Sequence, residues 1–174
     1  YDVVAIQEIR DISGSAIEQL EAKVDALGID YEYVIGPRVG RTDTYKEQYA
    51  FMYRVDRLVP GFSFTFNDDV DDLFEREPFV CEFSGEDFDF VLINIHTDPD
   101  FATVEIDSLP LVVDAAKMAW PDETEIIVLG DFNADGSYFD EDGPSNLKTS
   151  DYVWLITNDM DTNVAATSRT YDRI

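Results

Sequence analysis

Residues 125–138, EIIVLGDFNADGSY, contain the stretch that decides the fold. Residues 126–129 form a short apolar run rich in β-branched side chains, which is typical of a strand buried on both faces. The run ends at Gly130, and Asp131 and Asn133 follow at once. Loops at strand ends carry the chemistry of many α/β enzymes, so this stretch predicts a carboxylate and an amide at the rim of a sheet. An ordinary turn is the alternative, because Gly, Asp and Asn are turn formers.

The composition indicates one globular domain over residues 1–174. Hydrophobic residues make up 45% of the chain and aromatic residues 13%, which is enough for a sizeable core. No apolar run approaches the roughly 20 residues of a membrane span, so we expect no membrane insertion. The single Cys81 excludes an internal disulfide and is expected in the core. We expect a monomer, and secretion is an open alternative for its location.

The chain is strongly acidic, with 38 acidic against 12 basic residues and a net charge of −26. The acids are spread along the chain rather than gathered in a tail. At molar salt the Debye length falls to about 3 Å, so such a surface no longer repels itself. The charge therefore predicts a protein from a salt-adapted organism. Many divalent-cation sites are the competing interpretation.

The pattern of apolar residues predicts nine strands and two helices. The strands are expected at residues 2–7, 31–35, 49–53, 58–66, 79–83, 88–95, 125–129, 152–156 and from 171 onward. One helix should begin at a capping box formed by Ser15 and Glu18 and end at Gly28. The other should cover residues 103–120, with a kink at Pro110. Strands alternating with helices indicate an α/β fold, and the hairpin spacing of residues 49–95 adds antiparallel pairs.

Four of the expected strands end in side chains capable of chemistry. These are Glu8, His96, the pair Asp131 and Asn133, and Asp172. Taken singly, each has a plainer interpretation: a lone histidine after a strand is more often structural, and a lone glutamate is more often a surface carboxylate. Four such coincidences at strand ends favour one shared site.

Six short segments occur in the order found in one enzyme family. They are Gln7-Glu8-Ile9-Arg10-Asp11, Tyr45-Lys46-Glu47-Gln48-Tyr49, Arg76-Glu77-Pro78, Ile95-His96, Gly130-Asp131-Phe132-Asn133-Ala134 and Tyr171-Asp172-Arg173-Ile174. On these motifs the chain resembles the deoxyribonuclease I branch of the endonuclease/exonuclease/phosphatase superfamily over nearly its whole length. The resemblance implies an α/β (α+β) fold in which two mixed β-sheets pack as a sandwich with helices on the outside.

The resemblance also implies a function, the hydrolysis of DNA phosphodiester bonds with Mg²⁺ or Mn²⁺. Glu8 would ligate the metal, and Asp131 would position the metal or the attacking water. His96, oriented by Glu47, would act as acid or base at the scissile phosphate. Asn133 would donate to the phosphate, and Asp172 would orient a second histidine. The positions that resemble the family's DNA contacts are Arg10, Tyr45, Arg76, Thr167 and Tyr171.

Structural calcium sites are a further implication of the resemblance. One site would use Asp68 or Asp69, Asp72 and the carbonyl of Phe74, and a second would use Asp161 with the backbone near Asn163 and Thr167. A solvated acidic loop is the plainer alternative at both places. From the charge we also expect Arg10, Arg41, Arg76 and Arg173 to gather as a local basic patch for DNA.

The chain departs from the family pattern in three places. An Asn expected before Asp2 and an Asp-His pair expected after Ile174 are not in this sequence, which by that template begins and ends within the domain. We therefore expect residues 1–174 alone to be poorly stable and almost inactive. Gly136 and Arg169 stand where the family has cysteines, and Arg169 is free to reach the acidic loop instead. The alternatives are another phosphodiesterase or phosphatase of the superfamily, or an inactive nuclease-like binding module.

Overall fold

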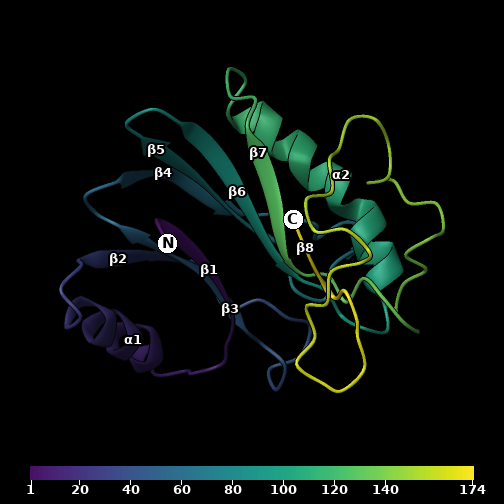
Figure 1. The fold of residues 1–174 in the computed structure, drawn as a ribbon, viewed down its shortest axis with the longest axis horizontal. Helices are drawn as coiled ribbons and strands as arrows, with labels where there is room; N and C mark the ends of the chain where they lie inside the picture. Colours follow the sequence, from purple (N-terminus) through teal and green to yellow (C-terminus); the bar gives the residue numbers. More distant parts are fainter.

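A computed structural model describes residues 1–174 as two β-sheets packed face to face (Figure 1). The smaller sheet has the strand order β1-β3-β2, with β1 at Val3–Ile9, β2 at Tyr31–Ile35 and β3 at Gln48–Arg54. The larger sheet has the order β4-β5-β6-β7-β8, with β4 at Leu58–Thr65, β5 at Phe79–Gly85, β6 at Asp89–His96, β7 at Ile126–Asp131 and β8 at Asp172–Arg173. The pair β6 and β7 is parallel and every other pair is antiparallel.

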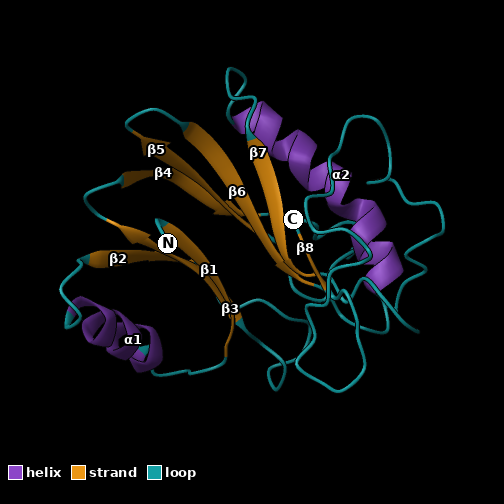
Figure 2. Cartoon of the chain, in the orientation of Figure 1, coloured by secondary structure: helices purple, strands orange, loops and turns teal.

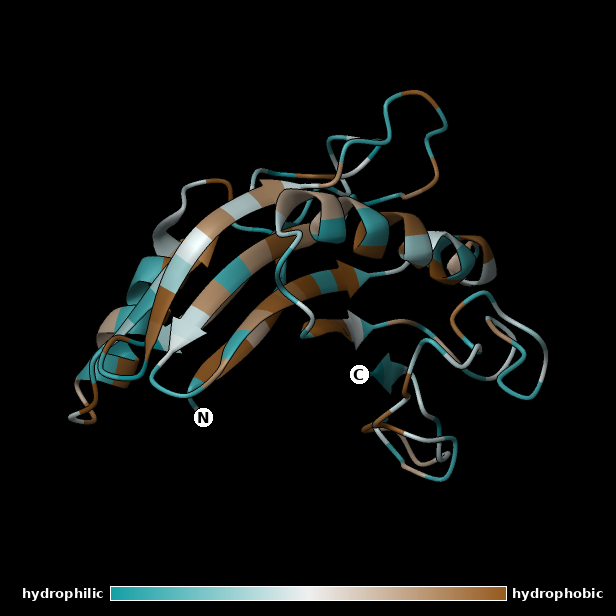
Figure 3. Cartoon of the chain, turned by 90° about the horizontal axis from the view of Figure 1, so that it is seen from above, coloured by the Kyte–Doolittle hydropathy of each residue, from teal (hydrophilic) through white to brown (hydrophobic).

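One helix lies on the outer side of each sheet (Figure 2). Helix α1 covers Ser15–Asp25 beside the smaller sheet, and α2 covers Ala102–Ala119 beside the larger one. The layers therefore follow the order helix, sheet, sheet, helix, and Figure 3 shows the strands banded in hydrophobic and hydrophilic residues. The expected fold class, a sandwich of two sheets with helices outside, is confirmed.

Aromatic side chains fill the space between the two sheets. Phe51 of β3 stacks on Phe79 with ring centroids 5.6 Å apart and meets Phe83 edge-on at 5.7 Å. Cys81 is fully buried in the same cluster, as the sequence predicts. Because β3 is the central strand of its sheet and is covered on both faces, its residues 49–53 are all buried.

The segment 152–156 is not a strand, so this prediction is wrong. Tyr152 and Trp154 pack against the core beneath α2, and the Trp154 indole N–H donates to the carbonyl of Leu147 at 2.9 Å. The alternating apolar pattern here reflects side chains that face the core from an irregular backbone. A β-strand and an irregular segment can show the same alternation of apolar residues, so the sequence did not distinguish them.

The start of α1 also differs from the prediction. Gly14, with φ at 77°, precedes the helix, and no side chain in the expected capping box caps it. Instead the carboxylate of Asp11 accepts the Ala16 N–H at 2.9 Å and the hydroxyl of Ser13 at 2.8 Å. A carboxylate is the stronger acceptor for an unpaired helical N–H, and it also suits the positive end of the helix dipole.

Helix α2 continues through Pro110 as one element.

No helix of the structure is both long and apolar enough to cross a bilayer.

Candidate active site

Three of the predicted site residues lie in one row across the larger sheet. His96 at the end of β6 is in register with Asp131 at the end of β7, and Asp131 is in register with Asp172 of β8. Parallel pairing of β6 and β7 brings their carboxyl ends to the same edge, which is why residues 35 positions apart become neighbours. The parallel pairing of β6 and β7 thus explains why the polar residues at these two strand ends lie side by side.

Glu47 and His96 form a hydrogen-bonded pair at this edge. The His96 Nδ1 lies 3.0 Å from a Glu47 carboxylate oxygen, and both side chains are largely buried. This confirms the contact expected from the sequence. Burial raises the pKa of Glu47, but the hydrogen bond and charge of His96, and then the charge of Arg76, outweigh it and leave the pKa lowered. The ionised carboxylate fixes the imidazole with Nδ1 as donor, which leaves Nε2 free for a reacting group.

Arg76 contacts both members of the Glu47 and His96 pair. Its Nε donates to the carbonyl oxygen of His96 at 3.0 Å and lies 3.9 Å from the Glu47 carboxylate. Only 5% of Arg76 is exposed, so the guanidinium is a fixed part of the site rather than a mobile surface group. Its position therefore favours holding the histidine over reaching far into a substrate.

Gln7 joins the two sheets beneath the site, and the sequence did not single out this role. Its Nε2 donates to the Asn94 Oδ1 and to the carbonyl of Ile95, both at 2.8 Å, while its Oε1 accepts the Asp131 N–H at 3.2 Å. The backbone packs so tightly here that a Cβ on Gly130 would lie 1.8 Å from the Ile95 oxygen. Only glycine fits, which explains the Gly before Asp131.

Two predicted residues hold left-handed backbone conformations, which cost energy in a side chain other than glycine. Glu8 has φ at 55° beside a register shift in β1, and Asn133 has φ at 47°. The Asn133 amide donates to the carbonyl of Thr97 at 3.0 Å, and its backbone N–H donates to the Asp131 carboxylate at 2.9 Å. Part of the Asn133 amide is thus used within the protein.

Asp172 lies in a negative environment. Burial raises its pKa, and the neighbouring charge of Asp131 raises it further, while His96 acts in the opposite direction. A half-buried carboxylate beside a second carboxylate is a donor that a cation would stabilise. Oxygen donors suit Mg²⁺ or Mn²⁺, and Mg²⁺ commonly uses only one or two carboxylates together with water. The donor types at this edge suit Mg²⁺ or Mn²⁺, although no group of three or more His, Cys, Asp or Glu residues is assembled here.

The calcium sites are not assembled. No group of three or more His, Cys, Asp or Glu residues lies close enough to hold a metal ion. Asp72 pairs with Arg41 at 3.0 Å, and Asp161 accepts the N–H groups of Asn163 and Arg169, both at 3.1 Å. Asp72 is thus used in a contact with a neighbouring loop, and Asp161 in contacts within its own loop.

The predicted substrate contacts are spread over several loops. Tyr45 is 62% exposed, Thr167 is exposed, and Arg10 donates to the carbonyl of Thr44 at 3.0 Å. Tyr171 is half-buried beside Tyr138.

The basic patch expected from the charge is wrong for Arg41 and Arg173, whereas Arg10 and Arg76 both act on the Glu47 carboxylate. Arg173 is 1% exposed, pairs with Glu141 at 3.1 Å and lies over the Trp154 ring. Arg41 is engaged by Asp72 and Glu75. In so acidic a chain, an arginine finds a carboxylate in its own neighbourhood before it joins other arginines.

Arg169 does reach the acidic loop, as the sequence suggests. Its Nη1 lies 3.4 Å from the Asp135 carboxylate, and the guanidinium passes over Gly136. An ion pair therefore links the two segments for which the resemblance implies a disulfide.

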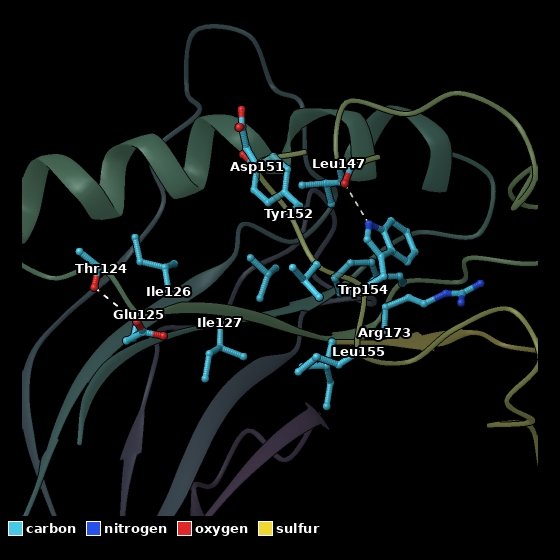
Figure 4. A pocket seen from close by; sticks show the side chains of 14 residues that line it. Thr124, Glu125, Ile126, Ile127, Leu147, Asp151, Tyr152, Trp154, Leu155 and Arg173 are labelled. Carbon is cyan, nitrogen blue, oxygen red and sulfur yellow. Dashed lines mark hydrogen bonds between the residues drawn. The ribbon is translucent and has the colours of Figure 1, made fainter. Parts of the chain in front are cut away.

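A pocket of about 400 Å³, whose lining side chains Figure 4 shows, includes neither Glu47 nor His96 in its lining. It opens between β7 and the segment 151–155, and most of its lining is apolar, including Ile126 and Trp154. Of the site residues considered above, only Arg173 lines it. The chemistry-bearing groups are therefore on the sheet edge and not in this pocket.

Comparison with known proteins agrees with the class that the fold defines, a β-sandwich flanked by helices. Residues 1–174 match the Endonuclease/Exonuclease/phosphatase family, and the chain belongs to that family. Deoxyribonuclease gamma of Homo sapiens is 38% identical over 186 residues, covering 99% of this chain and 60% of the relative. Deoxyribonuclease-1 of Gallus gallus is 36% identical over 185 residues, covering 100% of this chain and 65% of the relative. The chain thus spans less than two thirds of the length of these curated relatives.

Solved structures show the same fold at lower identity. A family protein from Bacteroides thetaiotaomicron superposes with a TM-score of 0.54 at 23% identity, covering 79% of this chain and 53% of that one. Truncated TDP2 of Caenorhabditis elegans gives a TM-score of 0.57 at 13% identity, covering 99% of this chain and 68% of that one. The DNase I-like character comes from the sequence relatives, and these structures support the fold alone.

Proposed function

We propose that the protein is a metal-dependent deoxyribonuclease that hydrolyses phosphodiester bonds of DNA. The observation that carries the proposal is the buried hydrogen bond of 3.0 Å between Glu47 and His96, next to Asp131 at the parallel strand ends. Two of the similar proteins are named deoxyribonucleases, which supports DNA as the substrate.

The proton chemistry belongs to His96. With Nδ1 held by Glu47, Nε2 is the nitrogen that exchanges a proton with an oxygen of the scissile phosphate. The carboxylate stabilises the imidazolium when the proton is on the ring, and Arg76 fixes the backbone of His96 through its carbonyl. Asp172, by the family resemblance, would orient a second histidine, whereas residues 1–174 contain only His96.

Glu8 and Asp131 would hold Mg²⁺ or Mn²⁺. The bound ion would supply stabilisation of the negative charge that develops on the phosphate oxygens. Asn133, whose amide uses one N–H on the Thr97 carbonyl, would donate its other N–H to a phosphate oxygen. Arg10, Tyr45, Arg76, Thr167 and Tyr171 would contact or align the DNA.

Plasmid cleavage by the full-length protein tests the proposal. With Mg²⁺ or Mn²⁺ we expect nicking that EDTA abolishes, and His96→Gln or Glu47→Gln should lower the rate about 10² to 10⁴-fold. Asp56→Asn is the matched control, because Asp56 is an exposed carboxylate that pairs only with Arg54, at 2.7 Å. Unchanged cleavage by His96→Gln would overturn the proposal. Hydrolysis of phosphomonoesters without DNA cleavage would favour the other superfamily activities, and metal-independent DNA binding alone would favour a binding module.

We also propose that the enzyme works in concentrated salt, because its net charge is −26. At about 1 M salt the Debye length is roughly 3 Å, so repulsion between the surface carboxylates is screened. Both the free energy of unfolding and the DNA cleavage rate should therefore be higher in 2 M KCl than in dilute buffer. Thermal unfolding and plasmid nicking over a KCl series measure this, and a maximum of both in dilute buffer contradicts it.

A further inference from the structure

Glu105 is a buried carboxylate that the proposed chemistry does not use. It lies in the first turn of α2 with 0% exposure, between apolar neighbours such as Ile106 and Leu109 that are equally buried. An ionised group in such surroundings costs free energy unless it is hydrogen-bonded. An apolar side chain would pack there without that cost, so the presence of a carboxylate indicates a specific role.

Both oxygens of Glu105 accept backbone hydrogen bonds from two different loops. The Glu75 N–H donates to Oε1 at 2.8 Å, and the Asp98 N–H donates to Oε2 at 3.0 Å. The first loop precedes β5 and the second follows β6. One carboxylate thus joins two loops at the same edge of the larger sheet to helix α2.

The first loop leads directly to the histidine pair. Glu75 is followed by Arg76, whose Nε donates to the His96 carbonyl at 3.0 Å and lies 3.9 Å from the Glu47 carboxylate. Holding the Glu75 backbone therefore limits where the Arg76 guanidinium can lie. Arg76 in turn limits where His96 and Glu47 can lie.

The second loop follows the same histidine in the chain, because Asp98 lies two residues after His96. Asp98 follows Thr97, which makes one contact to the last residue of β7 and two to the loop that follows. The Thr97 N–H donates to the Asp131 carbonyl at 3.0 Å, its Oγ1 donates to the Phe132 carbonyl at 2.7 Å, and its carbonyl accepts the Asn133 amide at 3.0 Å. Holding the Asp98 backbone therefore fixes the segment that carries His96 and aligns it with Asp131 and Asn133.

We propose that Glu105 is a positioning residue that sets the geometry of the Glu47 and His96 pair by clamping the two loops that converge on it. The clamp acts through backbone N–H groups, so it depends on an acceptor at position 105 and not on the identity of residues 75 and 98. The kinetic part of this inference rests on the proposed deoxyribonuclease function, whereas its structural part does not.

Two variants of Glu105 test the clamp in the full-length protein. Glu105→Ala removes both acceptors, and Glu105→Gln keeps the shape but turns an N–H₂ group toward one of the two N–H donors. Asp107→Asn is the matched control on the same helix, because Asp107 accepts the Asn146 N–H at 2.9 Å and the Ser145 hydroxyl at 2.7 Å in a loop that holds no site residue.

Three readouts separate positioning from plain stability. They are the thermal midpoint, the kcat and KM of DNA cleavage, and the NMR titration of the His96 imidazole, whose signals are identified by their loss in His96→Gln. We expect Glu105→Ala to lower kcat about 10- to 100-fold, since a displacement near 1 Å costs on that order. Glu105→Gln should lower kcat less, both variants should shift the His96 titration midpoint, and Asp107→Asn should lower the thermal midpoint without either change.

The outcomes are distinguishable. If Glu105→Gln and Glu105→Ala lower only the thermal midpoint, with kcat and the His96 titration as in the wild type, the positioning role is wrong. If Glu105→Ala does not fold, the same two readouts on Glu105→Gln decide. If the wild type cleaves no DNA and the His96 titration still shifts in Glu105→Gln, the proposed function fails and the clamp is supported.

Discussion

The two helices cover their sheets in very different ways. α1 has 11 residues and buries one of them, Ile17, whereas α2 has 18 residues and buries eight. Two of the buried residues in α2 are polar, Glu105 and Ser108, and α1 has none. A helix that buries one residue only covers its sheet. A helix that buries eight is held firmly enough to serve as a fixed reference, that is, a rigid anchor for the loops beside it.

The difference shows which half of the sandwich sets the geometry of the site. His96, Asp131 and Asp172 all come from the sheet that α2 covers, and the loops around them are tied to α2 through Glu105. Glu47 comes from the other half and reaches the site by its hydrogen bond to His96. We infer that changes in α1 itself alter stability more than chemistry, while changes in and under α2 alter both.

The largest expected effect contrasts the same substitution on the two helices. Leu109→Ala on α2 empties a fully buried position and should lower the free energy of unfolding by about 2–5 kcal/mol. Leu20→Ala on α1 removes a side chain that is 41% exposed and should cost less than about 1 kcal/mol. Urea denaturation of both variants and the wild type measures this, and equal losses would remove the contrast between the helices.

The parts of this architecture that the sequence predicted are those with a local pattern. The apolar run before Gly130 marks β7, and the polar residues after it mark the strand end, because both signals lie within ten residues. Glu105 has no such signature, since its partners Glu75 and Asp98 meet it only through the fold. Within α2 it resembles any acidic residue of a first helical turn.

Long-range hydrogen bonds explain the other gaps as well. Gln7 was visible as part of the Gln-Glu segment, but its contacts to Asn94 and Ile95 span almost 90 residues. Conversely, the alternation at residues 152–156 was a strong local pattern without a neighbouring strand to pair with. Periodicity reports which side of a segment is buried, and pairing depends on what lies next to it.

The second expected effect concerns pH and the buried carboxylate of α2. Burial raises the pKa of Glu105 to about 7, against the lowering effect of its two backbone hydrogen bonds and of Arg76, while the charge of Asp98 adds to the rise. Arg41 and Tyr49 are the other titratable groups that its charge influences. Between its unfolded pKa of 4.5 and about 7, the folded protein binds more protons than the unfolded chain, so this contribution is complete below 4.5 and lost as the pH rises to 7.

Comparison with Glu105→Gln isolates this contribution from the other carboxylates. The difference in free energy of unfolding, wild type minus Glu105→Gln, should fall across pH 4.5–7 by at most about 1.4 kcal/mol per pH unit and be flat outside that window. Urea denaturation at half-unit steps measures it in 1 M KCl, which limits the effect of the remaining surface charge. A difference that is constant from pH 4 to 8 would show that Glu105 titrates like an exposed glutamate.

The smallest expected effect lies at the start of α1, where Asp11 performs on the surface a task that resembles that of Glu105 in the interior. Its carboxylate accepts the Ala16 N–H at 2.9 Å, and the hydrogen bonds from Ser13 and from the backbone lower the pKa of Asp11 to about 2. Asp11→Ala should destabilise the protein slightly, because the N–H groups at the start of the helix lose their acceptor.

Asp11→Asn separates the acceptor from the charge, because an amide oxygen still accepts the Ala16 N–H. We expect Asp11→Asn to retain most of the stability and Asp11→Ala to lose it, with DNA cleavage by folded protein unchanged in both. Denaturation and plasmid nicking of the two variants measure this. A loss of cleavage in Asp11→Ala beyond its loss of folded protein would mean that the start of α1 also positions the neighbouring Arg10, and the division between a covering helix and a reference helix would no longer hold.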